Sequence, residues 1–86
     1  MKLKPNIITQ PLGDRLLVLD LDGNVYFSLN ESARFMLESL LKGLSPEQTA
    51  KDAESLFLAS YDDILNDIHE FMDTLKNENL IDNLNT

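Results

Sequence analysis

The residues with the clearest chemical potential lie in one stretch, LLVLDLDGNVYFSLNE, at positions 16–31. Asp20 and Asp22 form a D-x-D-G pattern directly after four apolar residues, a spacing suited to an aspartate nucleophile that transfers phosphate. Counted from Asp20, oxygen-bearing side chains also occupy positions 1, 3, 5, 9 and 12, as in a loop that binds calcium. Strand-like runs flank Asp22-Gly23, so the stretch is also compatible with a β-hairpin that carries no chemistry.

Phosphate transfer on an aspartate needs more than this pattern. The nucleophile has to lie at the end of a parallel strand, next to a Mg²⁺ ion that further carboxylates hold. Such a site requires several strand–helix–strand units, and no second crossover of this kind follows residue 31. Asn24 also stands where phosphatases of the haloacid-dehalogenase type normally have Thr. The phosphotransfer interpretation is therefore disfavoured.

A calcium-binding EF-hand loop is disfavoured for a different reason. Its sharp turn needs a glycine at loop position 6, and that position is Val25 in this chain. Gly23 comes two residues too early, and the preceding PLGDRLLVL is too short and too rich in helix breakers to be the entering helix. In an acidic protein the ligand spacing arises by accident. The hairpin is the favoured interpretation.

Length and composition are those of one small folded domain. The chain has 86 residues, of which 43% are hydrophobic and 26% are charged, so a disordered chain is not indicated. No apolar run approaches the roughly 20 residues that span a bilayer, and the N-terminal MKLKPNIITQ lacks the apolar region of a secretory signal. Cysteine is absent, which excludes disulfides and thiolate nucleophiles. We predict a cytoplasmic protein with a single domain over residues 1–86.

The net charge of −8 is concentrated in the C-terminal half of the chain. Residues 1–45 hold five acidic and five basic side chains, whereas residues 46–86 hold ten acidic side chains against Lys51 and Lys76. A surface with this excess of carboxylates repels phosphate groups. Nucleic acid is therefore a disfavoured partner.

Three strand-like segments are predicted in the N-terminal half. NIIT, at positions 6–9, is compatible with a short edge strand, and a second strand is predicted over 15–21 after a turn at Gly13-Asp14. Asp22-Gly23 then favours a β-hairpin, because glycine tolerates the positive φ of such turns. The third run places three side chains on the core face and two on the opposite face: Val25, Phe27 and Leu29, then Tyr26 and Ser28.

After the third run the apolar period changes from two to about 3.6, which predicts helices. Asn30 is placed to cap a first helix that ends near Gly43. Ser45-Pro46-Glu47-Gln48 predicts the start of a second helix, which is expected to end near 59–60, and a third helix begins near Asp62. The final NLIDNLNT is compatible with a short extended piece and a polar tail. The predicted fold class is α+β, winged-helix-like, with a three-stranded antiparallel sheet followed by three α-helices.

No other set of residues assembles an active site. His69 is the only histidine, and a solvent-exposed position on the third helix is the simplest expectation for it. Five carboxylates of this helix are expected to form a solvated face: Asp62, Asp63, Asp67, Glu70 and Asp73. There is no glycine-rich phosphate loop, no serine nucleophile elbow and no Cys/His cluster. We predict that the protein is not an enzyme and uses no metal or other cofactor.

A set of ordered motifs resembles one family, the PqqD-like proteins, which are also called RiPP recognition elements. The chain matches the family pattern, in order, at these residues: Val25-Tyr26, Leu29-Asn30, Ser32-Ala33, Gly43, Ser45-Pro46-Glu47, Tyr61, Asp67-Ile68, Phe71, Leu75 and Leu80-Ile81. It departs from the pattern at Lys42, where Asp is common, and at Asn79, where Gly is usual. The resemblance places the core of the domain at about residues 16–82.

The resemblance implies a non-catalytic peptide-binding module. Members of the family hold the leader segment of a ribosomally synthesised precursor peptide and present it to a modifying enzyme, often a radical-SAM maturase. The leader adds a strand beside the third strand, in a groove that the third helix closes, so that main-chain hydrogen bonds supply affinity. Carried onto this sequence, the receiving strand consists of Val25, Tyr26, Phe27, Ser28 and Leu29.

The third helix has an apolar arc of about 120°, which is wide for a helix that packs on only one neighbour. Ile64 and Leu75 are expected in the core. Leu65, Ile68 and Met72 are predicted to line the groove, where the flexible Met72 thioether adapts to different partners. Asp67, at the rim, would favour a leader that carries Lys or Arg, mainly by raising the association rate.

Two other functions stay open on the sequence alone. A winged helix is more often a DNA-binding fold, but residues 62–78 carry six acidic side chains and one basic side chain, which opposes phosphate contacts. A general protein–protein adaptor is the second alternative. The open strand edge also allows pairing with a second copy of the chain, so a homodimer is a further expectation.

Overall fold

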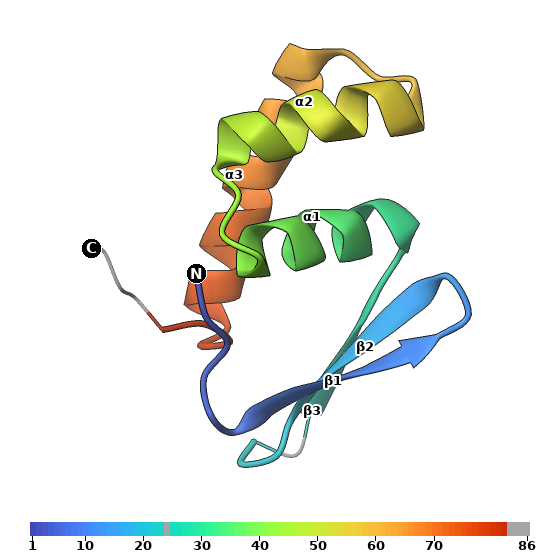
Figure 1. Cartoon of the computed structure of the whole chain (residues 1–86). Coiled ribbons are helices and arrows are strands. Elements are labelled where there is room, and N and C mark those ends of the chain that lie inside the picture. The colour runs from blue at the N-terminus through green and yellow to red at the C-terminus, as the bar shows by residue number, and fades with distance from the viewer. Residues whose placement is uncertain (24, 83–86) are drawn as a thin grey trace.

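The computed structural model describes residues 1–23 and 25–82 of the chain. It contains three strands followed by three helices, in the order that the sequence predicts (Figure 1). The strands are β1 (Ile7–Leu12), β2 (Arg15–Asp20) and β3 (Val25–Leu29). The helices are α1 (Glu31–Leu41), α2 (Pro46–Phe57) and α3 (Tyr61–Asn77). Asn24 and the polar tail expected at 83–86 lie outside the described residues.

The strands form one antiparallel sheet in the order β1-β2-β3. Gly13-Asp14 is a two-residue turn between the paired residues Leu12 and Arg15, and Gly13 adopts a φ of 63°, which glycine tolerates without strain. β1 is longer than the predicted NIIT, because the strand continues through Pro11. Proline is tolerated there because β1 lies at an edge of the sheet, where the missing amide hydrogen has no neighbouring strand to bond.

The stretch around Asp20 forms a structural turn between β2 and β3. Oδ1 of Asp20 accepts hydrogen bonds from the main-chain amides of Asp22 (3.1 Å) and Gly23 (3.0 Å) and from Nδ2 of Asn6 (2.9 Å). The predicted hairpin is confirmed, with Asp20 paired to Val25 across it, but Gly23 does not adopt the positive φ on which the prediction was based. The bond from the Gly23 amide is the main reason why the pKa of the Asp20 carboxyl lies below its usual value of 3.8. This carboxylate therefore stabilises a turn.

The lowered pKa predicts a contribution to stability that depends on the ionisation of Asp20. Because the folded-state pKa lies below the unfolded value of 3.8, the contribution is complete above that value and is lost as the pH falls through the folded-state pKa. We expect Asp20→Asn to unfold at lower urea concentration at neutral pH and to lose less stability between about pH 5 and about pH 2 than the wild type. Urea titrations followed by circular dichroism measure both. An identical acid dependence of the two proteins would contradict this role.

Side-chain caps start all three helices. Oδ1 of Asn30 accepts the Ala33 amide (2.9 Å) at the start of α1, as predicted. The predicted capping box of α2 is also present, since Ser45 and Gln48 each bond the main-chain amide of the other. Ser60 caps α3, which begins one residue before the expected Asp62. These local hydrogen bonds explain why the helix starts follow so closely from the sequence.

Two residues with positive φ follow helices. Leu58 adopts a left-handed conformation (φ 52°), so α2 ends at Phe57 rather than at the predicted 59–60. Asn79 has a φ of 59° and lies just beyond α3. Asparagine is one of the few residues that adopt this conformation with little strain, which explains how it replaces the glycine that the family pattern usually has there.

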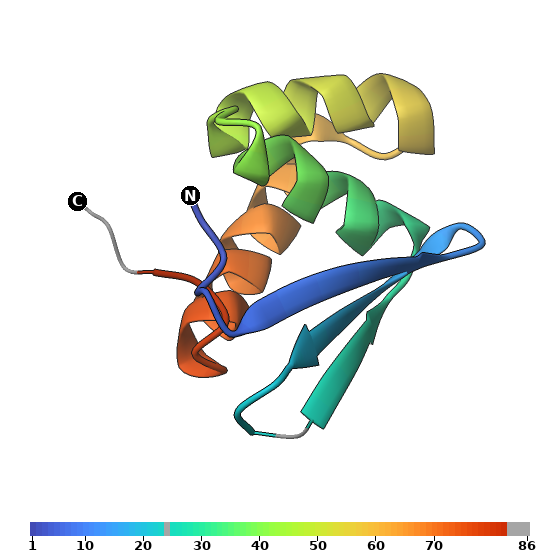
Figure 2. The ribbon, with the colours of Figure 1, turned by 60° about the horizontal axis from the view of Figure 1, so that its bottom comes forward.

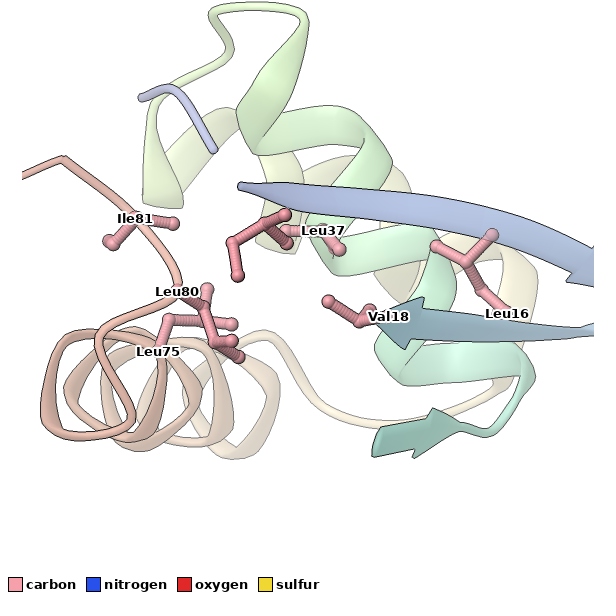
Figure 3. Close-up of a cluster of buried hydrophobic side chains, with 7 residues drawn as sticks. Leu16, Val18, Leu37, Leu75, Leu80 and Ile81 are labelled. Carbon is pink, nitrogen blue, oxygen red and sulfur yellow. The ribbon is translucent and has the colours of Figure 1, made fainter. Parts of the chain in front are cut away.

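The helices lie on one face of the sheet (Figures 1 and 2). A cluster of buried side chains joins the sheet to α1, α3 and the C-terminal segment (Figure 3): Ile7, Leu16, Val18, Leu37, Leu75, Leu80 and Ile81. The extended piece predicted near the C-terminus pairs with the start of the chain, where Leu3 and Ile81 form an antiparallel bridge. The sheet cluster, as we call it, thus ties both ends of the chain to the strands.

A second cluster joins the three helices to one another, and we call it the helix cluster: Leu40, Ala50, Ala53, Ile64 and Ile68. Thr49 lies in α2 and is completely buried. Its hydroxyl oxygen has no hydrogen-bond partner among the described residues. A buried polar atom without a partner lowers the stability of a fold, because it loses its bond to water on folding.

Thr49→Val is therefore expected to stabilise the protein. Valine has nearly the same shape and the same helix propensity, so the main change is removal of the unpartnered hydroxyl. We expect a gain of about 1 kcal/mol in the free energy of unfolding. Thermal and urea denaturation of the two proteins check this. A loss of stability would mean that the Thr49 hydroxyl is bonded in solution.

Candidate functional site

The outer edge of β3 is open. β3 lies at one end of the sheet, with β2 on one side and no strand of the described residues on the other (Figure 2). β1 forms the opposite edge. An unpaired edge offers a row of main-chain donors and acceptors to another extended chain.

One hydrogen bond fixes which main-chain groups of β3 point outward. The Leu21 amide donates to the Asn6 carbonyl (3.0 Å), on the β1 side of the sheet. Because the main-chain groups of an antiparallel strand alternate between its two neighbours, Asp20 and every second residue before it point toward β3. Their partners in register are Val25, Phe27 and Leu29. The amide and carbonyl groups of Tyr26 and Ser28 therefore point away from β2, toward the open edge.

The side chains of β3 divide between the two faces of the sheet. Phe27 and Leu29 are half-buried against the sheet cluster, as predicted. The prediction that Val25 faces the core is wrong, since this side chain is 50% exposed. Val25 lies at the hairpin end of β3, where the helices do not cover the sheet (Figure 2). Tyr26 and Ser28 are exposed, and the Ser28 hydroxyl accepts a hydrogen bond from Nε of Arg15 (2.9 Å).

The prediction that Ile68 lines an open groove is wrong, because its side chain has no exposed surface (0%). Ile68 lies one helical turn after Ile64 on the buried line of α3, and both belong to the helix cluster. The expected burial of Ile64 and Leu75 is confirmed. A completely buried isoleucine contributes to packing and offers no surface to a ligand.

The two margins of the apolar arc of α3 have different neighbours. Leu65 and Met72 are half-buried against the helix cluster, which contains no strand residue. Phe71 packs against both clusters, including the sheet cluster that Phe27 and Leu29 also cover. Phe71 therefore marks the margin of α3 that meets the sheet cluster. A groove role for Leu65 and Met72 stays a prediction, and Phe71 is a candidate that the sequence prediction did not include.

Asp67 lies on the same side of α3 as Phe71. It is exposed and lines a hollow of about 170 Å³ with residues from the start of α1 and the end of α2. At about 100° per residue, Asp63 and Glu70 fall on this side of the helix too. The salt bridge of the described residues joins two α1 side chains, so no described Lys or Arg neutralises these carboxylates. An acidic border therefore accompanies the Phe71 margin of α3.

We also searched the described residues for a metal site and for a membrane-spanning helix. The described residues contain no group of three His, Cys, Asp or Glu side chains arranged to hold a metal ion. His69 is exposed on α3, as predicted. None of the described helices has the length and apolar character needed to cross a membrane. The open edge of β3, beside the half-buried Phe27 and Leu29, is thus a feature of the described residues suited to binding an extended peptide.

Comparison with known proteins gives the family. The family model for coenzyme PQQ synthesis protein D (PqqD) matches residues 15–81, most of the chain. The chain belongs to the PqqD family. The resemblance predicted from the ordered motifs is confirmed, although no curated protein matches this chain.

Two solved structures share the fold of this PqqD-family protein. TbiB1 in complex with the TbiA(beta) leader peptide has a TM-score of 0.87 at 20% identity, and the match covers 100% of both chains. Lasso peptide synthetase B1, complexed with the leader peptide, has a TM-score of 0.86 at 26% identity, and the match covers 92% of this chain and 93% of that chain. The predicted α+β fold is thereby confirmed.

Proposed function

We propose that this PqqD-family protein is a non-catalytic module that binds the leader segment of a ribosomally synthesised precursor peptide and presents the peptide to a modifying enzyme. The observation that carries the proposal is the open edge of β3, where Tyr26 and Ser28 direct their main-chain groups away from β2. The lasso peptide synthetase B1, which has the same fold at 26% identity, is complexed with a leader peptide. This relationship supports a ligand of the same class here.

In this proposal the leader becomes a fourth strand of the sheet. Its main chain bonds the outward amide and carbonyl groups of Tyr26 and Ser28, which supplies affinity with little dependence on sequence. Alternate leader side chains point toward the helices and meet the half-buried Phe27, Leu29 and Phe71. These apolar contacts would select among peptides.

A labelled leader peptide tests the proposed function. The probe is a fluorescein-labelled synthetic leader of the candidate precursor peptide encoded by the nearest small open reading frame, with a scrambled leader as control. We expect saturable binding in fluorescence anisotropy, with the scrambled peptide weaker by about tenfold or more. Equal binding of the true and scrambled leaders, or of neither, would contradict the proposal.

A modifying enzyme is the second proposed partner. The sequence resemblance points to a radical-SAM maturase, whereas the second solved structure belongs to a lasso peptide synthetase. The proposed contact at β3 is the same for either class of enzyme, because it consists of main-chain hydrogen bonds to the leader. Because ribosomes make the precursor, we place this step in the cytoplasm. We propose no cofactor for the module itself.

The acidic border of α3 predicts a preference for leaders with basic residues. Asp67 and its neighbours raise the local concentration of a positively charged peptide, and salt screens this effect. We expect Asp67→Asn to slow leader association about twofold, with little change in dissociation, and the difference to vanish near 1 M salt. Stopped-flow fluorescence measures both rates. A leader without basic residues that binds tightly and independently of salt would contradict this preference.

DNA binding and homodimerisation are the competing functions, and they would involve α3 and the edge of β3. DNA binding would place α3 against phosphates, and α3 carries five acidic side chains within Tyr61–Asn77 against Lys76. A homodimer through β3 would occupy the edge that the leader needs, so the two states exclude one another. Sedimentation with and without leader separates them, because the peptide should dissociate any such dimer. A dimer that persists with bound leader would place the self-contact elsewhere.

A further inference from the structure

An apolar surface lies at the end of α2. Leu56 is 61% exposed on the last turn of the helix, and Leu58 is 96% exposed directly after it. Leu58 also adopts a left-handed conformation (φ 52°, ψ 40°) that costs a residue other than glycine about 1 kcal/mol. Neither its backbone conformation nor its exposure contributes to folding. A residue that is unfavourable to the fold on both counts is a candidate for a binding role.

A hollow of about 480 Å³ is lined in part by Leu56, and Leu58 follows two residues later along the chain. Its apolar part is formed by Leu56 with Phe35 and Phe57, whose rings pack edge to face at 5.6 Å between centroids. This size accommodates one or two large side chains. We call Leu56, Leu58 and the hollow the α2 corner.

Carboxylates form the rim of this hollow: Asp14, Glu31 and Glu38. Arg34, the one basic residue of the lining, is already engaged. Its Nη1 donates to the carbonyls of Gly13 (3.2 Å) and Arg15 (3.1 Å), and its Nε donates to Glu38 (3.2 Å). Asp14 and Glu31 form no salt bridge with any described residue. The rim therefore keeps a net negative charge beside an apolar floor.

The hollow lies next to the one that contains Asp67, because Phe57 lines both. Its lining residues come from the β1–β2 turn, α1 and α2, and none comes from β3 or α3. An occupant of the α2 corner has to bring large apolar side chains flanked by Lys or Arg, because the rim repels acidic segments and phosphates.

We propose that the α2 corner docks the modifying enzyme, through a segment of that enzyme with one or two large apolar side chains flanked by basic residues. This inference rests on the proposed function, because it assigns a surface to the second partner of a leader-binding module. One face of the protein then holds the peptide while another holds the enzyme. Charge complementarity and the two exposed leucines carry the assignment.

Two substitutions test the surface without damaging the fold. Leu58→Gly removes the side chain and relieves the left-handed backbone, so it should preserve or raise stability. Leu56→Ser removes a second exposed apolar side chain. Leu21→Ser is the matched control, because Leu21 has the same 61% exposure as Leu56 but lies at the β2–β3 turn. Thermal denaturation verifies that all variants fold.

The assay measures binding of the purified enzyme that modifies the precursor peptide to the immobilised protein with its leader bound. We expect the Leu56→Ser/Leu58→Gly double variant to raise the enzyme Kd by about tenfold or more, and Leu21→Ser to leave it within about twofold. An enzyme Kd unchanged in the double variant, a loss confined to Leu21→Ser, or no enzyme binding to the wild type would each overturn the proposal. The leader titration of the wild-type protein tests the proposed function separately.

Discussion

Ser28→Pro is expected to abolish leader binding, with a rise in Kd of about 100-fold, or about 2.8 kcal/mol. The Ser28 amide is one of two on β3 that point to the open edge, and proline has no amide hydrogen to donate. The proline ring also takes up space that the main chain of an added strand would occupy. The pairing of β3 with β2 keeps its hydrogen bonds, because Val25, Phe27 and Leu29 provide them. Fluorescence anisotropy with the labelled leader measures the change.

Two matched variants separate loss of the edge from general damage. Ser28→Ala keeps the amide and removes only the hydroxyl that bonds Arg15. Thr9→Pro removes an outward amide from the opposite edge of the sheet, because Thr9 pairs with Val18, whose main-chain groups point to β3. Both should leave the leader Kd within about threefold. If Thr9→Pro weakened binding as much as Ser28→Pro, the result would contradict leader binding at the edge of β3.

Ile68→Ala is expected to lower the free energy of unfolding by about 3 kcal/mol. The side chain is completely buried between helices, so its removal leaves a cavity in the helix cluster. For a chain of this size such a loss is a large part of the total stability. Urea denaturation followed by circular dichroism gives the value.

Met72→Ala is the matched control on the neighbouring margin of α3. Met72 is only half-buried, so its removal should cost about 1 kcal/mol. Leader affinity, measured in the cold where both variants are folded, should change less than about threefold for Ile68→Ala. If Ile68→Ala kept full stability and lost leader binding, Ile68 would line a groove in solution, as the sequence alone suggests.

Local interactions made most of the fold predictable from the sequence. The starts of α1 and α2 followed from the Asn30 cap and the Ser45–Gln48 capping box. Asp22-Gly23 marked the hairpin correctly, although Gly23 does not adopt the positive φ that was expected of it. Such signals depend on residues a few positions apart, which the sequence displays directly. The end of α2 was less predictable, because no glycine marks the left-handed conformation of Leu58.

The site was less predictable, because it depends on which elements face one another. A helical wheel gives the apolar arc of α3 two margins. It does not say that Phe71 packs against both clusters while Leu65 and Met72 pack only against the helix cluster. Burial of Ile68 likewise needs the positions of α1 and α2. Val25 lies on the same face of β3 as Phe27 and Leu29, as the period of two predicts. It is nevertheless exposed, because the helices do not extend over the hairpin end of the sheet. The apolar period shows which face of a helix or strand is apolar, but it does not show which other elements pack against that face.

An amide-shift titration of the isotope-labelled protein with its precursor leader tests the central claim most directly. Binding by strand addition predicts saturable NMR shifts along Val25–Leu29, the largest at the outward amides of Tyr26 and Ser28, with smaller shifts around Phe71 on α3. The amides of β1, at the opposite edge, should move little. Saturable shifts that avoid β3 and gather on another surface would contradict leader binding by strand addition.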